Sequence, residues 1–252
     1  MIHPSAYVSP KAKVADSACI GPWCLVDDFS EIGENVVLES RVHVLSHVKI
    51  GEGTFVFDGA SLGNIPQDLK FGGERTALEI GAHAKIREYV TIHRGTSESG
   101  KTVIGDGVLL MAYVHVAHDC VVESGAVVSN GVQLGGHVHV GEFANIGGTS
   151  GVAQNCRIGA FSFIGASLKV DRDVPPYVKA LGDPLRFAGV NLHALRKFPD
   201  RFPESRIVEI EKLYREFYHA KLPMRENAKK MAKSGDLAIG EFFSREDFPI
   251  IR

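Results

Sequence analysis

The feature that most constrains this chain is a strict six-residue repeat of aliphatic side chains. Every sixth residue from the second to the sixty-second is aliphatic: Ile2, Val8, Val14, Ile20, Val26, Ile32, Leu38, Val44, Ile50, Val56 and Leu62. The phase returns at Ile80, Ile86 and Ile92 and then runs unbroken from Ile104 to Val170. If about a third of residues were Ile, Val or Leu, eleven such positions in a row would have odds of roughly one in 10⁵.

This period excludes the two common patterns. A helix needs apolar spacings of three and four, and an ordinary strand needs a spacing of two. Six-residue spacing, often with glycine after the aliphatic residue (Gly21, Gly33, Gly51), is instead typical of the hexapeptide parallel β-helix. Three hexads close one triangular coil of 18 residues, so about nine coils are predicted. Resemblance to this repeat class implies a left-handed helix, an exception to the usual handedness of crossovers.

The same period predicts the environment of most of the cysteines. Cys24, Cys120 and Cys156 occupy the small fifth position of their hexads, so we expect buried thiols that pack as small apolar groups. Cys19 lies at another hexad position and carries no such prediction. Four cysteines in 252 residues favour a reducing compartment.

Composition excludes several classes of protein. The 28 Lys and Arg against 30 Asp and Glu give a net charge of −2, which argues against a nucleic-acid partner bound through bulk positive charge. No run of about 18 apolar residues predicts a transmembrane segment. The first residues, Met1-Ile2-His3-Pro4, lack a basic region and an apolar region, so no signal peptide is evident. We therefore expect a cytoplasmic protein.

Two interruptions break the repeat, at residues 64–79 and 97–102. The first is polar and glycine-bearing, contains Asp68 and Lys70, and is expected to be a loop. The second is short and polar. Because solenoid insertions usually lie on one face, which is often the binding face, the first interruption is a candidate for function as well as a surface excursion.

The C-terminal third follows a different pattern. Pro175-Pro176-Tyr177 ends the strand repeat, and helical spacing predicts helices from Pro203-Glu204 through Phe217, over Met224–Lys233 and over Leu237–Phe243. We therefore predict a β-helix domain at 1–178 and a helical domain at 179–252. Residues 185–252 hold 14 basic and 10 acidic residues, which leaves 14 and 20 in the first 184. The basic tail suits a solvated helix surface or an acidic partner.

Histidines gather in one part of the repeat, at positions 115, 118, 137 and 139. A coil of 18 residues places His118 under Gly136 and Asp119 under His137. A histidine with a carboxylate to orient it is what deprotonating a hydroxyl near neutral pH requires. The flexible pair Gly135-Gly136, at the matching corner, offers a backbone N–H as a candidate donor to a developing oxyanion.

The residues alone leave other readings open. Adjacent side chains on a strand point to opposite faces, so His118 and Asp119 need not touch. Histidines on one edge also form a zinc-binding set, as in a metal-dependent hexapeptide enzyme of the carbonic-anhydrase type. An inert polar edge, or a scaffold that only binds partners, is a third reading. The sequence contains no Gly-Lys-Ser/Thr phosphate loop and no serine nucleophile elbow.

Several longer motifs resemble one enzyme family. They are Ile86–Thr96, Asn64–Gly73 with its Gln-Asp-Leu-Lys, Ala117–Cys120, and Asp173–Val178 followed by Gly189-Val190-Asn191. Together they resemble the acyl-[acyl-carrier-protein]–UDP-N-acetylglucosamine O-acyltransferases of lipid A biosynthesis, over nearly the whole chain. The resemblance implies transfer of an (R)-3-hydroxyacyl group from the carrier-protein thioester to the 3-hydroxyl of UDP-N-acetylglucosamine. It also implies a homotrimer with sites between adjacent prisms, and no cofactor or metal besides the carrier's phosphopantetheine.

The resemblance assigns roles residue by residue. His118 matches the general base, Asp119 the residue that supports it, and the Gly136 amide the oxyanion donor. Ala166 matches a position that measures the acyl chain, where alanine predicts an intermediate or long chain. The positions that match substrate-binding residues are Asp68, Lys70, His115, His137, Gln154, Asn191, Arg196 and Lys197.

Three departures separate this chain from the family pattern. Ala153 precedes Gln154 where a histidine is common, and Phe198 follows Lys197 where a second phosphate-binding arginine is expected. The second interruption is also shorter than usual. None of these changes touches His118. Some relatives acylate a 3-amino analogue of the sugar to form an amide, and that alternative acceptor stays open.

Overall fold

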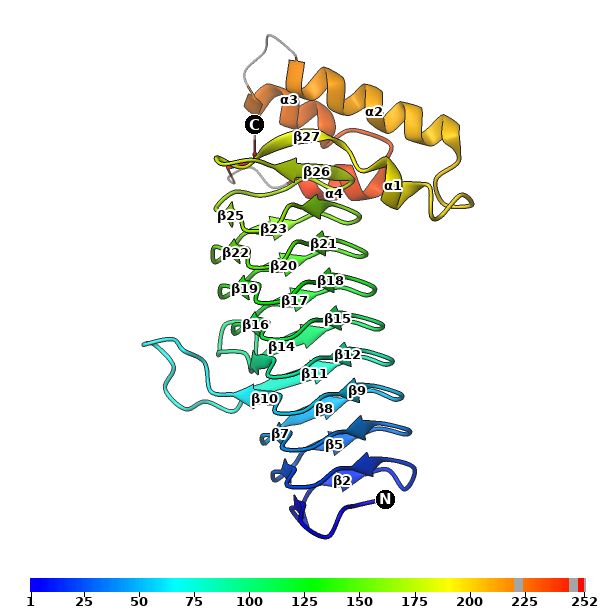
Figure 1. Ribbon diagram of the computed structural model, residues 1–252. Coiled ribbons are helices and arrows are strands. Elements are labelled where there is room, and N and C mark those ends of the chain that lie inside the picture. The colour runs from blue at the N-terminus through cyan, green and yellow to red at the C-terminus, as the bar shows by residue number, and fades with distance from the viewer. Residues whose placement is uncertain (220–223, 245–248, 252) are drawn as a thin grey trace.

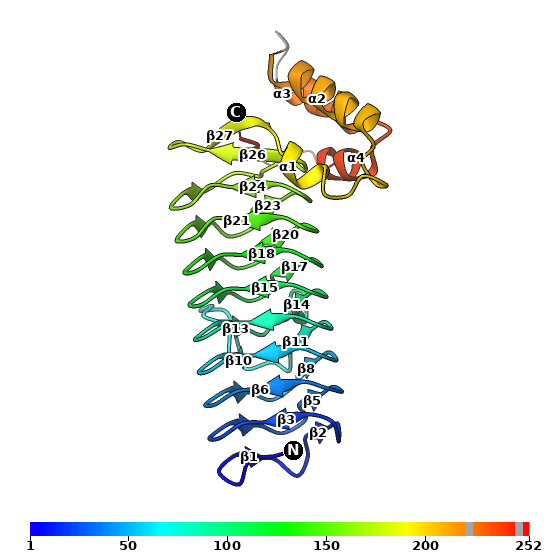
Figure 2. The same ribbon diagram turned by 45° about the vertical axis from the view of Figure 1, so that its right-hand side comes forward.

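The chain forms a tall three-sided prism of stacked strands with helices at one end (Figure 1). This computed structural model describes residues 1–219, 224–244 and 249–251. The N-terminus lies at the free end of the prism and the C-terminus near the helical end, as both views show (Figure 2). Within the described residues, no helix is long and apolar enough to cross a membrane.

Each hexad contributes one short strand, and successive strands lie on three successive faces of the prism. The first face contains β1 (Tyr7–Val8), β4 (Leu25–Val26), β7 (His43–Val44), β10 (Ser61–Asn64), β13 (Thr91–His93), β16 (His115–Val116), β19 (Gln133–Leu134), β22 (Gly151–Val152) and β25 (Lys169–Val170). The second contains β2 (Lys13–Val14), β5 (Glu31–Ile32), β8 (Val48–Ile50), β11 (Ala77–Ile80), β14 (Lys101–Ile104), β17 (Val121–Val122), β20 (His139–Val140) and β23 (Arg157–Ile158). The third contains β3 (Cys19–Ile20), β6 (Val37–Leu38), β9 (Phe55–Val56), β12 (Lys85–Ile86), β15 (Leu109–Leu110), β18 (Val127–Val128), β21 (Asn145–Ile146), β24 (Phe163–Ile164), β26 (Val178–Leu181) and β27 (Arg186–Val190).

The register of the sheets explains the repeat. Parallel pairing sets Val116 beside Leu134 and Leu134 beside Val152, one coil further along each time. These aliphatic side chains point inward and are almost fully buried, so each ladder forms a continuous core along the prism axis. The predicted left-handed parallel β-helix followed by helices is confirmed.

Corners between faces take two residues each, and the second residue often has a positive φ. Asp119 (φ 60°) and His137 (φ 60°) are in this left-handed conformation although neither is glycine. The small fifth position comes just after the corner, where a side chain turns into the core. Cys24, Cys120 and Cys156 are buried there as predicted, and burial raises the pKa of the Cys120 thiol to about 12, far from a reactive thiolate.

Both interruptions are loops at the corner between the first and second faces. Residues 65–76 connect β10 to β11 and project away from the prism (Figure 1). Residues 94–100, called here the 94–100 loop, connect β13 to β14. Because the ladder resumes after each loop with the aliphatic residues in place, both insertions leave the core intact.

The C-terminal part caps the last coil. The helices are α1 (Leu192–Leu195), which the sequence did not predict, α2 (Glu204–His219), α3 (Met224–Met231) and α4 (Leu237–Phe243). Strand β27 pairs antiparallel with β26, and the apolar face of α2 packs over the prism end, where the Tyr214 hydroxyl donates to the Pro176 carbonyl (2.7 Å). The domain boundary at residue 178 stays a prediction.

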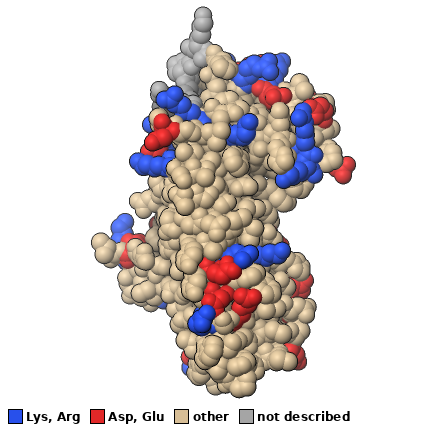
Figure 3. All heavy atoms as spheres, in the orientation of Figure 1, with Lys and Arg blue, Asp and Glu red and all other residues tan. Residues whose placement is uncertain are grey.

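Charge is distributed unevenly along the molecule. On the face that Figure 3 shows, Asp and Glu gather on the lower part of the prism, and most side chains coloured at the helical end are Lys and Arg. This agrees with the charge counts of the sequence, in which residues 185–252 hold 14 basic and 10 acidic residues.

A substitution in an aliphatic ladder tests whether neighbouring side chains along a strand point alternately into the core and outward. Leu110 is fully buried, and its neighbour Leu109 lies on the outer side of the same strand. We expect Leu110→Ala to lower the free energy of unfolding by about 2–5 kcal/mol, because it leaves a cavity in the ladder. Leu109→Ala is the matched control and should cost clearly less. Equal losses in chemical denaturation would contradict the assigned strand orientation.

Candidate active site

A groove of about 490 Å³ crosses the upper part of the first face beside the predicted catalytic residues. His115 on β16, Gln133 on β19 and Lys169 on β25 line its floor, and His118 and Gly136 lie along one side. Gln67, from the 65–76 loop, also contributes to its lining. The groove therefore joins the corner that carries the histidines to the flat face beside it.

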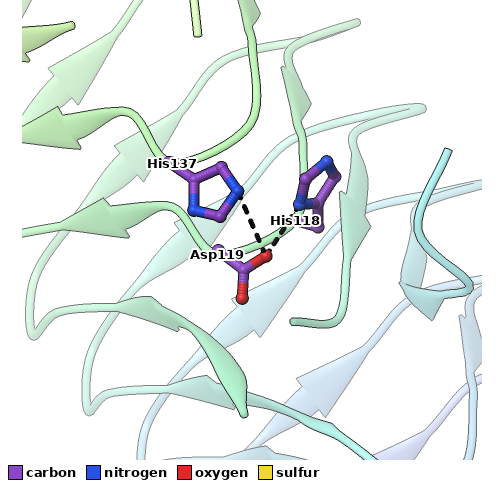
Figure 4. A group of neighbouring side chains, drawn as sticks. All are labelled: His118, Asp119 and His137. Carbon is purple, nitrogen blue, oxygen red and sulfur yellow. Dashed lines mark hydrogen bonds and ion pairs between the residues drawn. The ribbon is translucent and has the colours of Figure 1, made fainter. Parts of the chain in front are cut away.

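His118 and Asp119 are in contact because they form a corner and not a strand. The left-handed φ of Asp119 turns its side chain back toward its neighbour, so the alternation that would separate them on a strand does not apply. His118 Nδ1 lies 2.7 Å from Asp119 Oδ2, and Figure 4 shows the two side chains facing each other. The Thr102 hydroxyl accepts the Asp119 N–H (2.9 Å), which fixes the corner.

Four donors surround the Asp119 carboxylate, whose side chain is fully buried. Oδ1 accepts the Thr96 N–H (2.9 Å) and the Ser99 hydroxyl, and Oδ2 accepts the Thr96 hydroxyl (2.8 Å) and His118. Burial opposes the charge, but the bonds from Ser99, His118 and Thr96 outweigh it and hold the pKa of Asp119 at about 2. The carboxylate is therefore ionised at any physiological pH.

This pairing defines the chemical state of His118. With Nδ1 donating to Asp119, Nε2 is the ring nitrogen left to accept a proton. A Cβ on Gly136 would lie 2.7 Å from both Nε2 and Cε1 of this ring. Only glycine therefore allows His118 to lie against the backbone of the next coil. Within the described chain, no acceptor appears for the Gly136 N–H, which leaves it available beside His118.

His137 completes a possible metal-binding set. One ligand atom from each of His118, Asp119 and His137 lies within 4.8 Å of the others. His137 Nε2 is 3.7 Å from Asp119 Oδ2, and the two imidazoles meet edge to face. Four hydrogen-bond donors already occupy the roughly four lone-pair positions of the Asp119 carboxylate. A metal ion would have to displace these donors, so the arrangement favours acid–base chemistry.

A second pair of histidines lies under the groove. The Thr91 hydroxyl and His115 Nδ1 are 2.8 Å apart, and His93 packs edge-on against His115. Burial, with the charges of His115 and His118, lowers the pKa of His93 to about 4, and burial also lowers the pKa of His115. Both rings are therefore neutral near pH 7. His93 was not among the predicted site residues, although its inward position at an interrupted strand signals it.

The four histidines that lie close together in the sequence, at positions 115, 118, 137 and 139, do not form one cluster in the structure. His139 lies on β20 of the second face, where Nε2 pairs with Glu123 (2.9 Å), away from the groove. Gln154 and Ala153 lie at the same corner as His118, two coils further on, and line the groove. The expected stacking of one coil on the next is seen for the corner residues. His139 does not join them, because the strands on either side of a corner lie on different faces.

Asp68 and Lys70 lie on the projecting 65–76 loop and not against His118 of the same chain. Asp68 accepts the Lys70 N–H (3.0 Å), and the Lys70 side chain is exposed. The loop extends outward from its own prism (Figure 1).

The predicted nucleotide-binding residues lie at the helical end. Asn191 is buried and caps α1, with its side chain donating to the Phe161 carbonyl (2.9 Å). Arg196 pairs with Glu204 (2.7 Å), and Lys197 is exposed. Phe198 packs against Phe161 in an aromatic cluster, so this departure from the family pattern serves the core.

Ala166 lies exposed at the corner between β24 and β25, on the opposite border of the first face from His118. Lys169, three residues further on, already lines the groove. A chain lying across the first face from His118 would therefore approach Ala166.

Two family models match different parts of the chain. The bacterial transferase hexapeptide model, of six repeats, matches residues 101–136, the segment with the His118 corner. This fold and site define a hexapeptide-repeat transferase. The model of the second domain of UDP N-acetylglucosamine O-acyltransferases matches residues 173–245.

Solved structures extend the likeness to the whole chain. UDP-N-acetylglucosamine O-acyltransferase (LpxA) from Moraxella catarrhalis is 40% identical with a TM-score of 0.94, covering 100% of this chain and 99% of that one. LpxA from Bacteroides fragilis is 35% identical (TM-score 0.94) over 100% of both chains. LpxA from Acinetobacter baumannii is 34% identical (TM-score 0.93) over 100% and 99%. The chain belongs to the UDP-N-acetylglucosamine O-acyltransferase family of enzymes.

Gly136→Ala tests the packing of His118 against the next coil. A Cβ at this position must push the His118 ring away, and displacement of a reacting group by about 1 Å costs on the order of 10²-fold in rate. We expect kcat/KM to fall by about that factor while circular dichroism and Tm stay near wild type. Full activity would contradict the close approach of His118 to the next coil.

Asp119→Asn tests the ionised carboxylate. The pKa of Asp119 is depressed from 3.8 to about 2, so its contribution to stability is complete above about pH 4 and is lost as pH falls toward 2. In urea denaturation, the variant should be less stable than wild type at pH 7, and the difference should narrow between pH 4 and pH 2.5. A constant difference over this range would contradict the assignment.

Proposed function

We propose that this enzyme transfers an (R)-3-hydroxyacyl group from acyl carrier protein to the 3-hydroxyl of UDP-N-acetylglucosamine, the first step of lipid A biosynthesis. The observation that carries the proposal is the His118–Asp119 pair, 2.7 Å apart, beside the backbone of Gly136 in a chain of this family. Its similarity to UDP-N-acetylglucosamine O-acyltransferases supports UDP-N-acetylglucosamine as the acceptor and O-acylation as the reaction.

The chemistry follows from the two available groups. His118 Nε2 takes the proton of the sugar 3-hydroxyl as its oxygen attacks the thioester carbon. The carbonyl oxygen becomes an oxyanion, which the Gly136 N–H stabilises by a hydrogen bond. The intermediate collapses, the C–S bond breaks, and the imidazolium returns the proton to the departing pantetheine thiolate. The products are the 3-O-acyl sugar nucleotide and the carrier-protein thiol.

Asp119 acts throughout as a fixed negative charge. It keeps the His118 proton on Nδ1 and stabilises the imidazolium that forms between the two proton transfers. Since its pKa is about 2, it does not take the proton itself. In this proposal no metal or cofactor takes part beyond the phosphopantetheine of the donor.

The distribution of the other predicted residues supports a site shared between chains. The 65–76 loop, which carries Asp68 and Lys70, extends outward from its own prism, and Arg196 and Lys197 directly follow α1 at the helical end. We propose a homotrimer in which loop 65–76 reaches the groove of a neighbouring prism. His115, His137 and Gln154 would then bind the sugar and acyl group, and Asn191, Arg196 and Lys197 the nucleotide, its phosphates or the pantetheine.

The acyl chain would lie across the first face. Its far border carries Ala166, whose methyl group leaves room that a bulky residue would fill. We propose that Ala166 sets the limit of chain length and admits an intermediate or long chain.

His118→Ala tests the proposed base. Removing a general base should lower kcat by about 10²–10⁴-fold, measured by thiol release from 3-hydroxyacyl carrier protein in the presence of UDP-N-acetylglucosamine. His139→Ala is the control, because this histidine pairs with Glu123 on another face. Activity of His118→Ala within a few-fold of wild type would overturn the role. Activity dependent on added Zn²⁺ would instead favour the metal-dependent reading.

A further inference from the structure

The 94–100 loop is built around the carboxylate of Asp119. It contributes three of the four donors to that carboxylate: the Thr96 N–H, the Thr96 hydroxyl and the Ser99 hydroxyl. The Gly100 N–H bonds the Thr96 carbonyl (2.8 Å) and closes a turn that sets Thr96 and Ser99 on the same side. The sequence shows residues 97–102 as a break in the repeat, and the matches to the two family models, at residues 101–136 and 173–245, begin after residue 100.

We propose that Thr96 and Ser99 are positioning residues for the acyl transfer, acting through Asp119 to fix the orientation and charge of the carboxylate that supports His118. The proposal rests on the proposed function, since it concerns the same base. It extends the catalytic unit from the corner pair to a four-residue chain, Ser99 and Thr96 to Asp119 to His118.

The direction of each hydroxyl proton supports this arrangement. The Thr96 oxygen accepts the Glu98 N–H (3.2 Å), so its single proton is free to point at Asp119 Oδ2. Ser99 has two acceptors within reach, Asp119 Oδ1 and the Lys101 carbonyl (2.9 Å). A charged carboxylate is the stronger acceptor, so the Ser99 proton goes to Asp119.

The two hydroxyls also share the negative charge of the Asp119 carboxylate with His118. Thr96 and Ser99 draw negative charge away from His118, and the Thr96 N–H on Oδ1 stops the carboxylate from rotating. Among the described residues, the titratable groups near this carboxylate are His118, the Cys120 thiol and His137, whose Nε2 is 3.7 Å from Oδ2; Glu98 lies 3.6 Å from the same His137 nitrogen. His93 is also close to this centre, and the charge of His118 contributes, after burial and His115, to the lowered pKa of His93.

The test compares Thr96→Val and Ser99→Ala, alone and together, with Thr96→Ser as the conservative variant. Ser97→Ala is the matched control, because Ser97 lies in the same loop but meets Glu74. Loss of one hydrogen bond to a charged group should lower kcat by about 10-fold, with KM for the sugar nucleotide within about twofold. The acidic limb of kcat/KM should move to higher pH, since a carboxylate with fewer donors holds an imidazolium more strongly. Thr96→Ser should restore both readouts.

A double-mutant cycle separates this role from a structural one. In an Asp119→Asn background, adding Ser99→Ala should cost almost nothing further, because the two residues act as one unit. Undiminished kcat and an unmoved acidic limb in Thr96→Val and Ser99→Ala, or equal losses with and without Asp119, would overturn the proposal.

A spectroscopic readout does not depend on the reaction. The proton resonance of the His118 Nδ1–H should shift in Ser99→Ala and stay in place in Ser97→Ala. If the wild-type enzyme does not transfer the acyl group but the Nδ1–H resonance shifts in Ser99→Ala, the proposed function is refuted and the positioning role is kept. If the wild-type enzyme transfers the acyl group but the resonance does not shift in Ser99→Ala, the positioning role alone is refuted.

Discussion

The parallel stacking of one coil on the next is the constraint on which the rest of this structure depends. Because each strand pairs with the strand one coil later, 18 residues on in the uninterrupted coils and 24 or 30 residues on across the two loops, the aliphatic ladders bury one another and the corners form straight columns. Adjacent coils are separated by about 4.8 Å, the spacing of paired strands. This distance is short enough for the ring of His118 to touch the backbone of Gly136, so the geometry of the candidate site is a consequence of the core.

Core and chemistry occupy different parts of each hexad. The ladder positions stay aliphatic along the prism, whereas outward and corner positions carry side chains of many kinds. His118, Asp119, Gly136 and His137 are all corner residues, and the two loops enter at the same corner. A fold with a repetitive core can therefore carry a cluster of unlike polar residues at one position along the prism.

Much of this was predictable from the sequence, for a physical reason. The repeat fixes which residues lie one coil apart, so His118 under Gly136 and Asp119 under His137 follow from counting, and α2 follows from its apolar spacing. Counting does not tell whether adjacent side chains meet. The contact of His118 with Asp119 depends on a left-handed corner, and His139 lies on another face than His115 because a corner separates their strands.

Loops and chain ends were less predictable because no periodicity governs them. The 94–100 loop gave no signal of its bonds to Asp119, which depend on the turn closed by Gly100. Asn191, predicted from resemblance to contact substrate, is buried as the cap of α1, a helix too short for spacing to reveal. Residues that act from a neighbouring chain, as we propose for Asp68 and Lys70, are placed by assembly and not by the repeat.

The central claim is that this corner directs acyl transfer to a sugar hydroxyl. Mass spectrometry of the wild-type enzyme with 3-hydroxyacyl carrier proteins of several chain lengths, and with UDP-N-acetylglucosamine or its 3-amino analogue, tests it most directly. We expect one added 3-hydroxyacyl group on UDP-N-acetylglucosamine, in an ester that mild base cleaves, with an intermediate or long chain preferred. An unmodified UDP-N-acetylglucosamine pool, or acylation of the amino analogue alone, would contradict it.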